Sequence, residues 1–400
     1  MNNNKKNRVK IISCFTGGGF MDIGFEQAGF ETIWTNEVES QFAEMYASGI
    51  TSWRTSKGED HSAKISDQRP LQDIPAPEII KAAFGNDVPD IFGIIGGPPC
   101  QDFSIAGNIK GFNGERGRLT ATFLERVSEL SPAFFVMENV EGLWKVKKNR
   151  NKLLELLKNI SDQFCIVTNV LNALEYGVPQ DRKRLFVVGF SRSHFVNADF
   201  DVPNKFRWPE KLYDNPLDNF NWPSRNTFGG RPRKAKGIPP ELCVNSCLVN
   251  EKSRTIANAK EVFKAYSEKF YQVEEGDTKS QSFKRLHRFR YSPTACYGNN
   301  EVHLHPFKPR RLSVREVLRI QGVPDEYVLP SLLGKERRHV GLSAKFKMIG
   351  NGVPVPLAYQ VGKAVLKFIS NKEVTKKNIL INGSEVNIQV EEHIPDNRLT

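Results

Sequence analysis

Short apolar runs alternate with helical periodicity through the first half of the chain. The apolar runs at 9–15, 30–37, 89–97, 133–139, 165–173 and 184–190 predict strands. Between them, apolar residues recur three or four positions apart and predict helices at 21–29, 40–48, 120–130 and 151–160. Strands that alternate with helices form a mostly parallel sheet covered on both faces. The pattern therefore predicts a doubly wound α/β fold, in which ligands bind at the carboxyl ends of the strands.

The alternation of strands and helices stops near residue 190. Residues 191–305 are rich in Pro, Gly, Asn, aromatic and basic residues and show no sustained period, which predicts a second, irregular domain. Helical periodicity resumes at 313–322 and 353–370. We therefore expect four parts: a first domain at 1–190, the irregular domain at 191–305, a return to the first domain at 306–372 and a tail at 373–400.

The distribution of charged residues points to an acidic binding partner. The composition, 39% hydrophobic and 26% charged, suits a soluble globular protein, and the formal net charge is +12. Residues 191–311 hold 22 Lys and Arg against 13 Asp and Glu, so most of the excess lies there. A basic surface concentrated in one region is what a polyanion would bind, although a solubilising face would carry the same charge.

The lengths of the apolar runs and the spacing of the cysteine and histidine residues bear on where the protein works and on whether it binds a metal. The apolar stretch near the N-terminus is too short for a signal peptide, and no run approaches the roughly 18 apolar residues of a membrane span. The six cysteines are irregularly spaced, which predicts reduced thiols in the cytoplasm. Cys243 and Cys247 have the spacing of half a zinc site, but without a second pair we favour two half-buried thiols. For His303 and His305 we favour strand packing or a phosphate contact over metal ligation, so no metal is expected.

A glycine loop and an acid point to a nucleoside ligand. "FTGGGF" at 15–20 follows the first strand and opens the first helix, and taken alone it fits a plain tight turn equally well. Glu37 ends the second strand about 20 residues later, where an acid can accept hydrogen bonds from both ribose hydroxyls. Without a phosphate-binding signal, the pair suggests a nucleoside cofactor such as S-adenosylmethionine.

A thiol, an acid and two guanidinium groups are expected at the same sheet edge. Cys100 follows two prolines that stiffen its backbone and present the thiol, which needs a nearby cation or helix N-terminus to act as a nucleophile. Glu138 and Asn139 end a later strand, and Arg182 and Arg184 start the strand beside it. Together these groups suit nucleophilic attack on an electron-poor ring.

Six segments then carry a family resemblance: "FTGGGF", "GGPPCQDFS", "MENVEG", "PQDRKRLFVVG", "RRLSVREVLRIQGVP" and "IGNGVPVP". They occur in the order seen in the DNA cytosine-5 methyltransferase family, prokaryotic restriction-modification type, and span residues 11 to about 365. The chain resembles that family, which implies a Rossmann-like methyltransferase fold and a target recognition domain at 191–305. Phe20 and Val38 depart from its pattern: the family usually has another glycine at the first, and often a bulky residue over the adenine at the second.

The resemblance implies methyl transfer from S-adenosylmethionine to C5 of a cytosine extruded from double-stranded DNA. Cys100 would attack C6 while Glu138 engages N3 as the acid. Arg184 would hold the base O2, and Arg182 would support the loop or contact phosphate. A monomer in the cytoplasm, bound to the nucleoid through DNA, is expected, and a cognate restriction endonuclease would act separately.

The same resemblance assigns two groups of contacts. For the cofactor it implies Phe15, Thr16, Gly17, Gly18, Gly19, Phe20, Glu37, Val38, Asp73, Ile74, Pro98, Asn351 and Gly352, with Asp60 competing with Asp73 for the adenine amino group. For nucleic acid we expect Gln101, Ser104, Arg116, Arg118, Gln180, Arg233 and Lys234.

Two other functions stay open. A cytosine-5 methyltransferase acting on tRNA would use the same chemistry with a smaller recognition region. A catalytically silent DNA-binding homologue would have no reason to keep Cys100, Glu138 and Arg184 together. No code links a loop-rich recognition region to a DNA sequence, so the target site is not readable from these residues.

Overall fold

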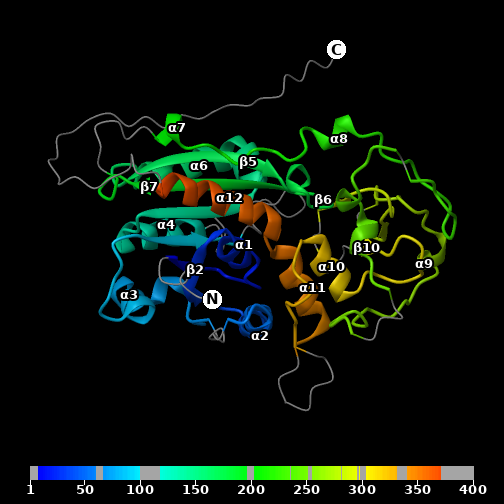
Figure 1. Cartoon of the computed structure of the whole chain (residues 1–400), viewed down its shortest axis with the longest axis horizontal. Helices are drawn as coiled ribbons and strands as arrows, with labels where there is room; N and C mark the ends of the chain where they lie inside the picture. The colour runs from blue at the N-terminus through cyan, green and yellow to red at the C-terminus, as the bar shows by residue number, and fades with distance from the viewer. Residues whose placement is uncertain are drawn as a thin grey trace.

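The protein has two parts, a sheet covered by helices and an irregular region beside it (Figure 1). The computed structural model describes residues 8–59, 66–99, 118–195, 202–234, 236–250, 255–280, 282–294, 297, 303–330 and 340–370. The predicted tail at 373–400 lies outside these residues. Within the described residues, no helix combines the length and apolar character that crossing a membrane requires.

Six strands form the central sheet in the order β2-β1-β3-β4-β7-β5. All neighbours run parallel except β7, which is antiparallel to both β4 and β5. The predicted doubly wound, mostly parallel sheet is confirmed, and the direction of β7 is a feature that the apolar pattern does not reveal. The strands are β1 Val9–Cys14, β2 Phe30–Asn36, β3 Phe92–Gly96, β4 Phe134–Val140, β5 Phe164–Asn172 and β7 Lys183–Ser191.

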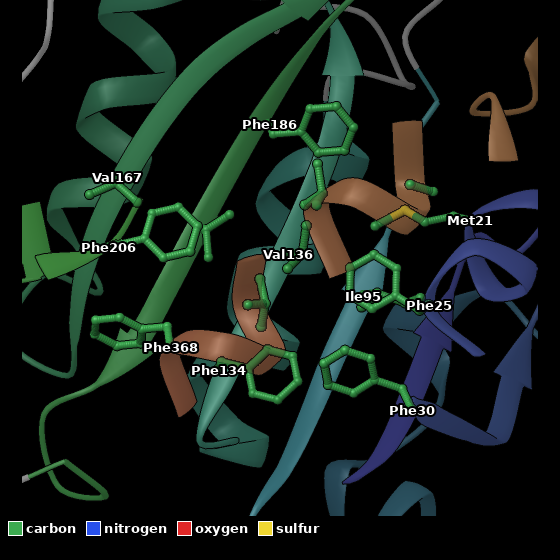
Figure 2. Packing of buried hydrophobic residues seen from close by; sticks show 14 of the residues in the cluster. Met21, Phe25, Phe30, Ile95, Phe134, Val136, Val167, Phe186, Phe206 and Phe368 are labelled. Atoms are coloured by element: carbon green, nitrogen blue, oxygen red, sulfur yellow. The ribbon is translucent and has the colours of Figure 1, made fainter. Parts of the chain in front are cut away.

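Two helices cover one face of the sheet, α1 (Phe20–Ala28) and α12 (Val355–Ile369). Their apolar side chains pack against alternate residues of the strands, because successive strand residues point to opposite faces. Figure 2 shows this layer, with Phe25 of α1 and Phe368 of α12 among its side chains. The Phe25 ring lies 5.3 Å from Phe30 of β2, and the Phe368 ring lies 4.2 Å from Phe190 of β7. The aromatic side chains of α1 and α12 thus fix the helix that follows the glycine loop against the sheet.

The opposite face packs against α3 (Ala76–Phe84), α4 (Arg118–Leu130) and α6 (Lys147–Lys158). Ile94 and Phe135 point to this face, whereas their neighbours Ile95 and Phe134 point to the other. The Phe135 ring meets Phe164 edge to face at 5.3 Å. A strand buried on both faces explains the continuous apolar runs that the sequence shows.

A third apolar cluster joins the sheet to the irregular region. It combines α1 and α2 (Ser40–Ser56) with α10 (Val314–Ile320), α11 (Leu342–Asn351) and the turn η5 (Val244–Cys247). The buried Lys345 ammonium of α11 also bonds Glu261 Oε2, in the irregular region, at 2.7 Å. Figure 1 shows α10 and α11 between the two parts.

The described residues of the irregular region form only short elements, as its composition predicts. Arg285 holds part of it together by donating to the carbonyl oxygens of Val273 at 2.7 Å and Lys308 at 3.0 Å. The domain boundaries remain predictions, although Val202 and Phe206 pack in the sheet's core beyond residue 190. The remaining elements are η1 Leu71–Asp73, α5 Gly142–Lys145, η3 Ala173–Tyr176, β6 Gln180–Asp181, α7 Val202–Lys205, α8 Pro216–Asn219, η4 Pro240–Leu242, α9 Lys269–Gln272, β8 Lys284–Arg285, β9 Ser292–Pro293 and β10 His303–Leu304.

Candidate active site

The predicted site residues follow strands whose carboxyl ends lie in register. Cys14, the last residue of β1, pairs with Asn36 at the end of β2 and with Gly96 at the end of β3. Gly96 in turn pairs with Met137, one residue before Glu138. The chain leaves β1 for β2 on one side and reaches β3 on the other, so the strand order reverses here, where α/β sheets bind ligands.

The glycine loop and the predicted ribose acid meet directly. Gly17 N donates to Glu37 Oε2 at 2.8 Å, and Glu39 N donates to Glu37 Oε1 at 2.9 Å. Burial raises the pKa of Glu37, although these two backbone hydrogen bonds oppose the shift. Gly17 has φ +57°, and none of the described residues beyond its chain neighbours has an atom within 4 Å of where a Cβ would stand, so the backbone there faces open space in this part of the structure.

The loop also contacts the predicted C-terminal cofactor motif. A Cβ on Gly18 would lie 2.1 Å from Met348 Sδ, and one on Gly352 would lie 2.3 Å from the Phe20 ring. Both glycines are therefore required by close packing between the loop and α11. The Phe20 side chain, the departure from the family pattern, fills the space beside Gly352. Asn351, the last residue of α11, is exposed next to this contact.

The adenine end of the predicted cofactor site is less complete. Val38 is 56% exposed, Asp73 is exposed in η1 and Ile74 is fully buried, while Asp60 lies outside the described residues. Asp67 was missed by sequence reasoning. Its backbone O accepts a hydrogen bond from Glu37 N at 3.0 Å, and its neighbour Arg69 lowers the pKa of its carboxyl. Asp67 lies in a segment without periodicity, so no sequence signal marks its position beside Glu37.

Glu138 and Arg184 form a buried pair at the end of β4. Arg184 Nε lies 2.9 Å from Glu138 Oε1, and both residues are less than a tenth exposed. Burial raises the pKa of Glu138, and the positive charges of Arg184 and Arg182 oppose that shift. A carboxyl with a raised pKa keeps its proton closer to neutral pH than an ordinary glutamate, which suits a general acid.

The same strand end touches the segment that leads to Cys100. A Cβ on Gly97 would lie 3.0 Å from Glu138 Oε2, so glycine lets the carboxyl lie against this backbone. Asn139 Nδ2 donates to Pro98 O at 3.3 Å, and Pro98 is buried. Cys100, with Gln101, Ser104 and Arg116, lies outside the described residues.

Arg182 is held inside the protein. Its guanidinium is fully buried and donates from Nη2 to Gly350 O at 2.8 Å and Gly352 O at 2.9 Å. Gln180 is fully buried as well, and its Nε2 donates to Gln321 Oε1 at 3.3 Å. These contacts favour loop support over a phosphate contact for Arg182, and the predicted nucleic-acid contact of Gln180 stays a prediction.

Replacing Arg182 by methionine is expected to lower the free energy of unfolding by about 3 kcal/mol, because two buried carbonyl groups lose a charged donor. Urea unfolding followed by circular dichroism measures the change. Arg207→Met, at an exposed position, is the matched control and should change stability by less than about 0.5 kcal/mol. A loss for Arg182→Met no larger than that of the control would contradict the supporting role.

The predicted DNA contacts outside the sheet lie at the surface. Arg118, at the start of α4, and Arg233 and Lys234, in the irregular region, are all exposed. The irregular region meets the segment before β7 where Gln180 in β6 pairs with Ser292 in β9. β7, which carries Arg184, begins at Lys183 directly after this pair and therefore starts beside the predicted recognition region.

The candidate metal ligands are buried. Burial raises the pKa of Cys243 to about 11 and that of Cys247 to about 12, so both thiols are protonated at neutral pH. His303 and His305 are each no more than 2% exposed. Over the described ranges, no three His, Cys, Asp or Glu side chains group in a way that would hold a metal ion.

Comparison with known proteins gives one consistent result. A family model described as C-5 cytosine-specific DNA methylase matches residues 9–367. The Type II methyltransferase M.NmeDI of Neisseria meningitidis serogroup C is 39% identical, over 92% of this chain and 86% of that protein. The Type II methyltransferase M.FnuDI of Fusobacterium nucleatum is 29% identical, over 93% and 98%. The crystal structure of a putative DNA modification methyltransferase encoded within an E. coli prophage matches with a TM-score of 0.57 and 26% identity, over 91% of this chain and 100% of that one.

Proposed function

This chain belongs to the C-5 cytosine-specific DNA methylase family, and on that premise we propose that it methylates C5 of a cytosine extruded from double-stranded DNA at a specific sequence. The chain is a DNA (cytosine-5)-methyltransferase related to those of Type II restriction-modification systems. The specificity, the extruded base and the covalent route are the proposed part.

The observation that carries the proposal is the Glu138–Arg184 pair against Gly97, three residues before Cys100. Cytosine C5 is too weak a nucleophile to accept a methyl group directly. Bond formation between the Cys100 thiolate and C6, with the Glu138 proton engaging N3, would place electron density on C5. C5 would then take the methyl group that S-adenosylmethionine supplies. Loss of the C5 proton and cleavage of the bond between sulfur and C6 would restore the aromatic ring, now methylated, and Cys100.

Arg184 would have two tasks in this chemistry. Its guanidinium contacts Glu138 Oε1 at 2.9 Å, which orients the carboxyl, and a free N–H can donate to the base O2. Since the reacting edge is hidden in a stacked duplex, the base must leave the helix first, at a cost of a few kcal/mol.

The residues around the glycine loop fit S-adenosylmethionine, which would supply the methyl group. Each Glu37 carboxyl oxygen accepts one backbone N–H and keeps a lone pair for a ribose hydroxyl. The open space over Gly17 allows a ligand to approach the backbone. The exposed Asn351, beside Gly352 and Phe20, would contact the methionine end, and exposed Val38 would cover the adenine only partly.

Bisulfite sequencing of DNA from cells that express the protein tests the proposal. We expect full protection of one cytosine position within one short sequence, and no protection in cells with the empty vector. In vitro, methyl incorporation from labelled S-adenosylmethionine should enter duplex DNA and not tRNA. Incorporation into tRNA alone would replace the DNA assignment, and no incorporation into either would favour a silent DNA-binding homologue.

We further propose a monomer in the cytoplasm, with a cognate endonuclease that acts separately. Gel filtration with light scattering should give one species near the 45.3 kDa of the chain.

A further inference from the structure

A buried acid lies directly behind the glycine loop and has no part in the proposed chemistry. Asp22 is the third residue of α1 and is 1% exposed. Ser13 Oγ donates to Asp22 Oδ1 at 2.7 Å. Oδ2 is buried and has no hydrogen-bond partner at ordinary distance among the described residues, although the nearby Tyr46 hydroxyl acts on the carboxyl as a weak donor. A buried carboxyl oxygen that lacks a strong hydrogen bond lowers the stability of the folded protein, so its presence calls for a functional explanation.

Within the part of the chain that the structure describes, no cation forms an ion pair with Asp22. Arg54, on α2, binds Glu26 instead, with Nε to Oε2 at 3.1 Å, so that guanidinium is already neutralised. Burial raises the pKa of Cys14 to about 12 and raises that of Tyr46, which leaves both neutral. The titratable and charged groups that act on Asp22 or feel its charge are Cys14 on β1, Glu26 on α1, Tyr46 and Arg54 on α2, and Tyr327 after α10.

The charge of this carboxyl changes near neutral pH. Burial raises the pKa of Asp22 to about 7, and the hydrogen bonds from Ser13 and, more weakly, Tyr46 oppose the shift. An aspartate in the unfolded chain ionises near pH 4. Because the folded pKa is the higher one, ionisation costs stability, and this cost accumulates between about pH 4 and pH 7.

The side chains around Asp22 are the ones that hold the loop. Thr16 Oγ1 lies 3.5 Å from Ser13 Oγ, the group that also binds the carboxyl. Tyr327 Oη donates to Gly18 O at 2.8 Å, and a Cβ on Gly19 would lie 2.5 Å from the Tyr46 ring. Asp22 therefore sits in the layer directly beneath the segment that would contact the cofactor.

The cofactor and its product differ in one charge. S-adenosylmethionine carries a sulfonium cation, and S-adenosylhomocysteine, which remains after methyl transfer, has a neutral thioether in its place. A negative charge in the poorly solvated layer beneath the loop attracts the first more than the second. The sign of this preference is fixed by the sulfonium alone, since the two molecules share every other group.

We propose that Asp22 is a positioning residue whose carboxylate favours S-adenosylmethionine over S-adenosylhomocysteine and so assists product release. This inference rests on the proposed cofactor of the site. Asp22 touches no reacting atom and acts through the electrostatic potential at the loop. The contribution of Asp22 to the ratio of the two affinities should be small at a pH where the carboxyl is protonated. It should reach its full size at a pH where the carboxyl is ionised.

Calorimetric titration of the full chain with each ligand, between pH 6.0 and 8.5, tests the inference. In the wild-type protein we expect the ratio of the two affinities to shift roughly fivefold toward S-adenosylmethionine as the pH rises through 7. In Asp22→Asn, the asparagine Oδ1 can still accept a hydrogen bond from Ser13. In this variant the ratio of the two affinities should change with pH only through the ionisation of the ligands themselves. The difference between the two proteins isolates Asp22, because that ligand ionisation is common to both.

Asp162→Asn, which removes an exposed carboxylate, is the control and should behave as wild type. Thermal melts provide a check on folding: the melting temperature of Asp22→Asn relative to wild type should rise between pH 5 and pH 8. If both ligands bind and Asp22→Asn keeps the wild-type pH dependence of the ratio, the inference is overturned and the proposed function stands. If neither ligand binds to any of the proteins, the proposed function falls as well.

Discussion

Replacing Cys100 by serine is expected to lower methyl transfer to duplex DNA by several orders of magnitude, because a serine hydroxyl is far less nucleophilic than a thiolate. Binding of DNA and of S-adenosylmethionine should remain close to wild type, since Glu37, Glu138 and Arg184 are untouched. Labelled methyl incorporation measures the first effect, and gel-shift and calorimetric titrations measure the second.

A duplex that carries 5-fluorocytosine at the mapped target makes the same prediction visible as a covalent product. Fluorine blocks loss of the group at C5, so the wild-type protein should accumulate an adduct in the presence of S-adenosylmethionine, and peptide mapping should locate it at Cys100. Cys243→Ser is the matched control, because serine can keep the contact of Sγ with Pro239 O at 3.6 Å. Full activity of Cys100→Ser, or an adduct at another residue, would end the covalent proposal.

Replacing Glu138 by glutamine is expected to lower the rate of methyl transfer by about 10²- to 10⁴-fold, the range for loss of a general acid. Glutamine keeps an oxygen that can accept from Arg184 Nε, so the buried pair is not left with an unpaired guanidinium. The fold and the affinity for S-adenosylmethionine should therefore persist. Single-turnover kinetics on the mapped duplex measures the chemical step apart from product release.

The pH dependence gives this variant a second readout. Burial raises the pKa of Glu138, so in the wild-type protein this carboxyl should lose its proton, and the rate of methyl transfer should fall, as the pH rises through the raised pKa. The same fall in rate with rising pH should be absent in Glu138→Gln. Glu125→Gln, at an exposed position of α4, is the control and should match wild type. A Glu138→Gln rate within about threefold of wild type would exclude a general acid at this position.

The sequence predicts those parts of the site that end an apolar run. Glu37 and Glu138 lie at the ends of buried strands. Because helices between the strands imply a parallel sheet, and the carboxyl ends of parallel strands share an edge, the alternation of strands and helices places both acids at that edge. The same argument places the glycine loop beside Glu37. The match of six segments to one family supplied roles for these residues, which periodicity alone does not.

Other features depend on contacts between distant parts of the chain. Gln180 is buried and bonds Gln321, which lies 141 residues away in the chain. From the sequence alone, a glutamine at this position would be predicted to be exposed to solvent. Asp67 reaches Glu37 from a segment without regular structure. The antiparallel direction of β7 depends on its insertion between β4 and β5, and the apolar period of a strand is the same in either direction.

The ion pair between Lys345 and Glu261 limits how this enzyme can be re-engineered. Exchanging the irregular region for that of a relative is an obvious route to a new target sequence. A graft without an acid at position 261 would remove the counter-charge of the buried Lys345 ammonium, on α11, the helix that packs on the glycine loop, and leave it the Pro330 carbonyl as a partner. Such a chimera would lose roughly 3 to 5 kcal/mol of stability. Grafts should retain this acid, or replace Lys345 by methionine in the same step.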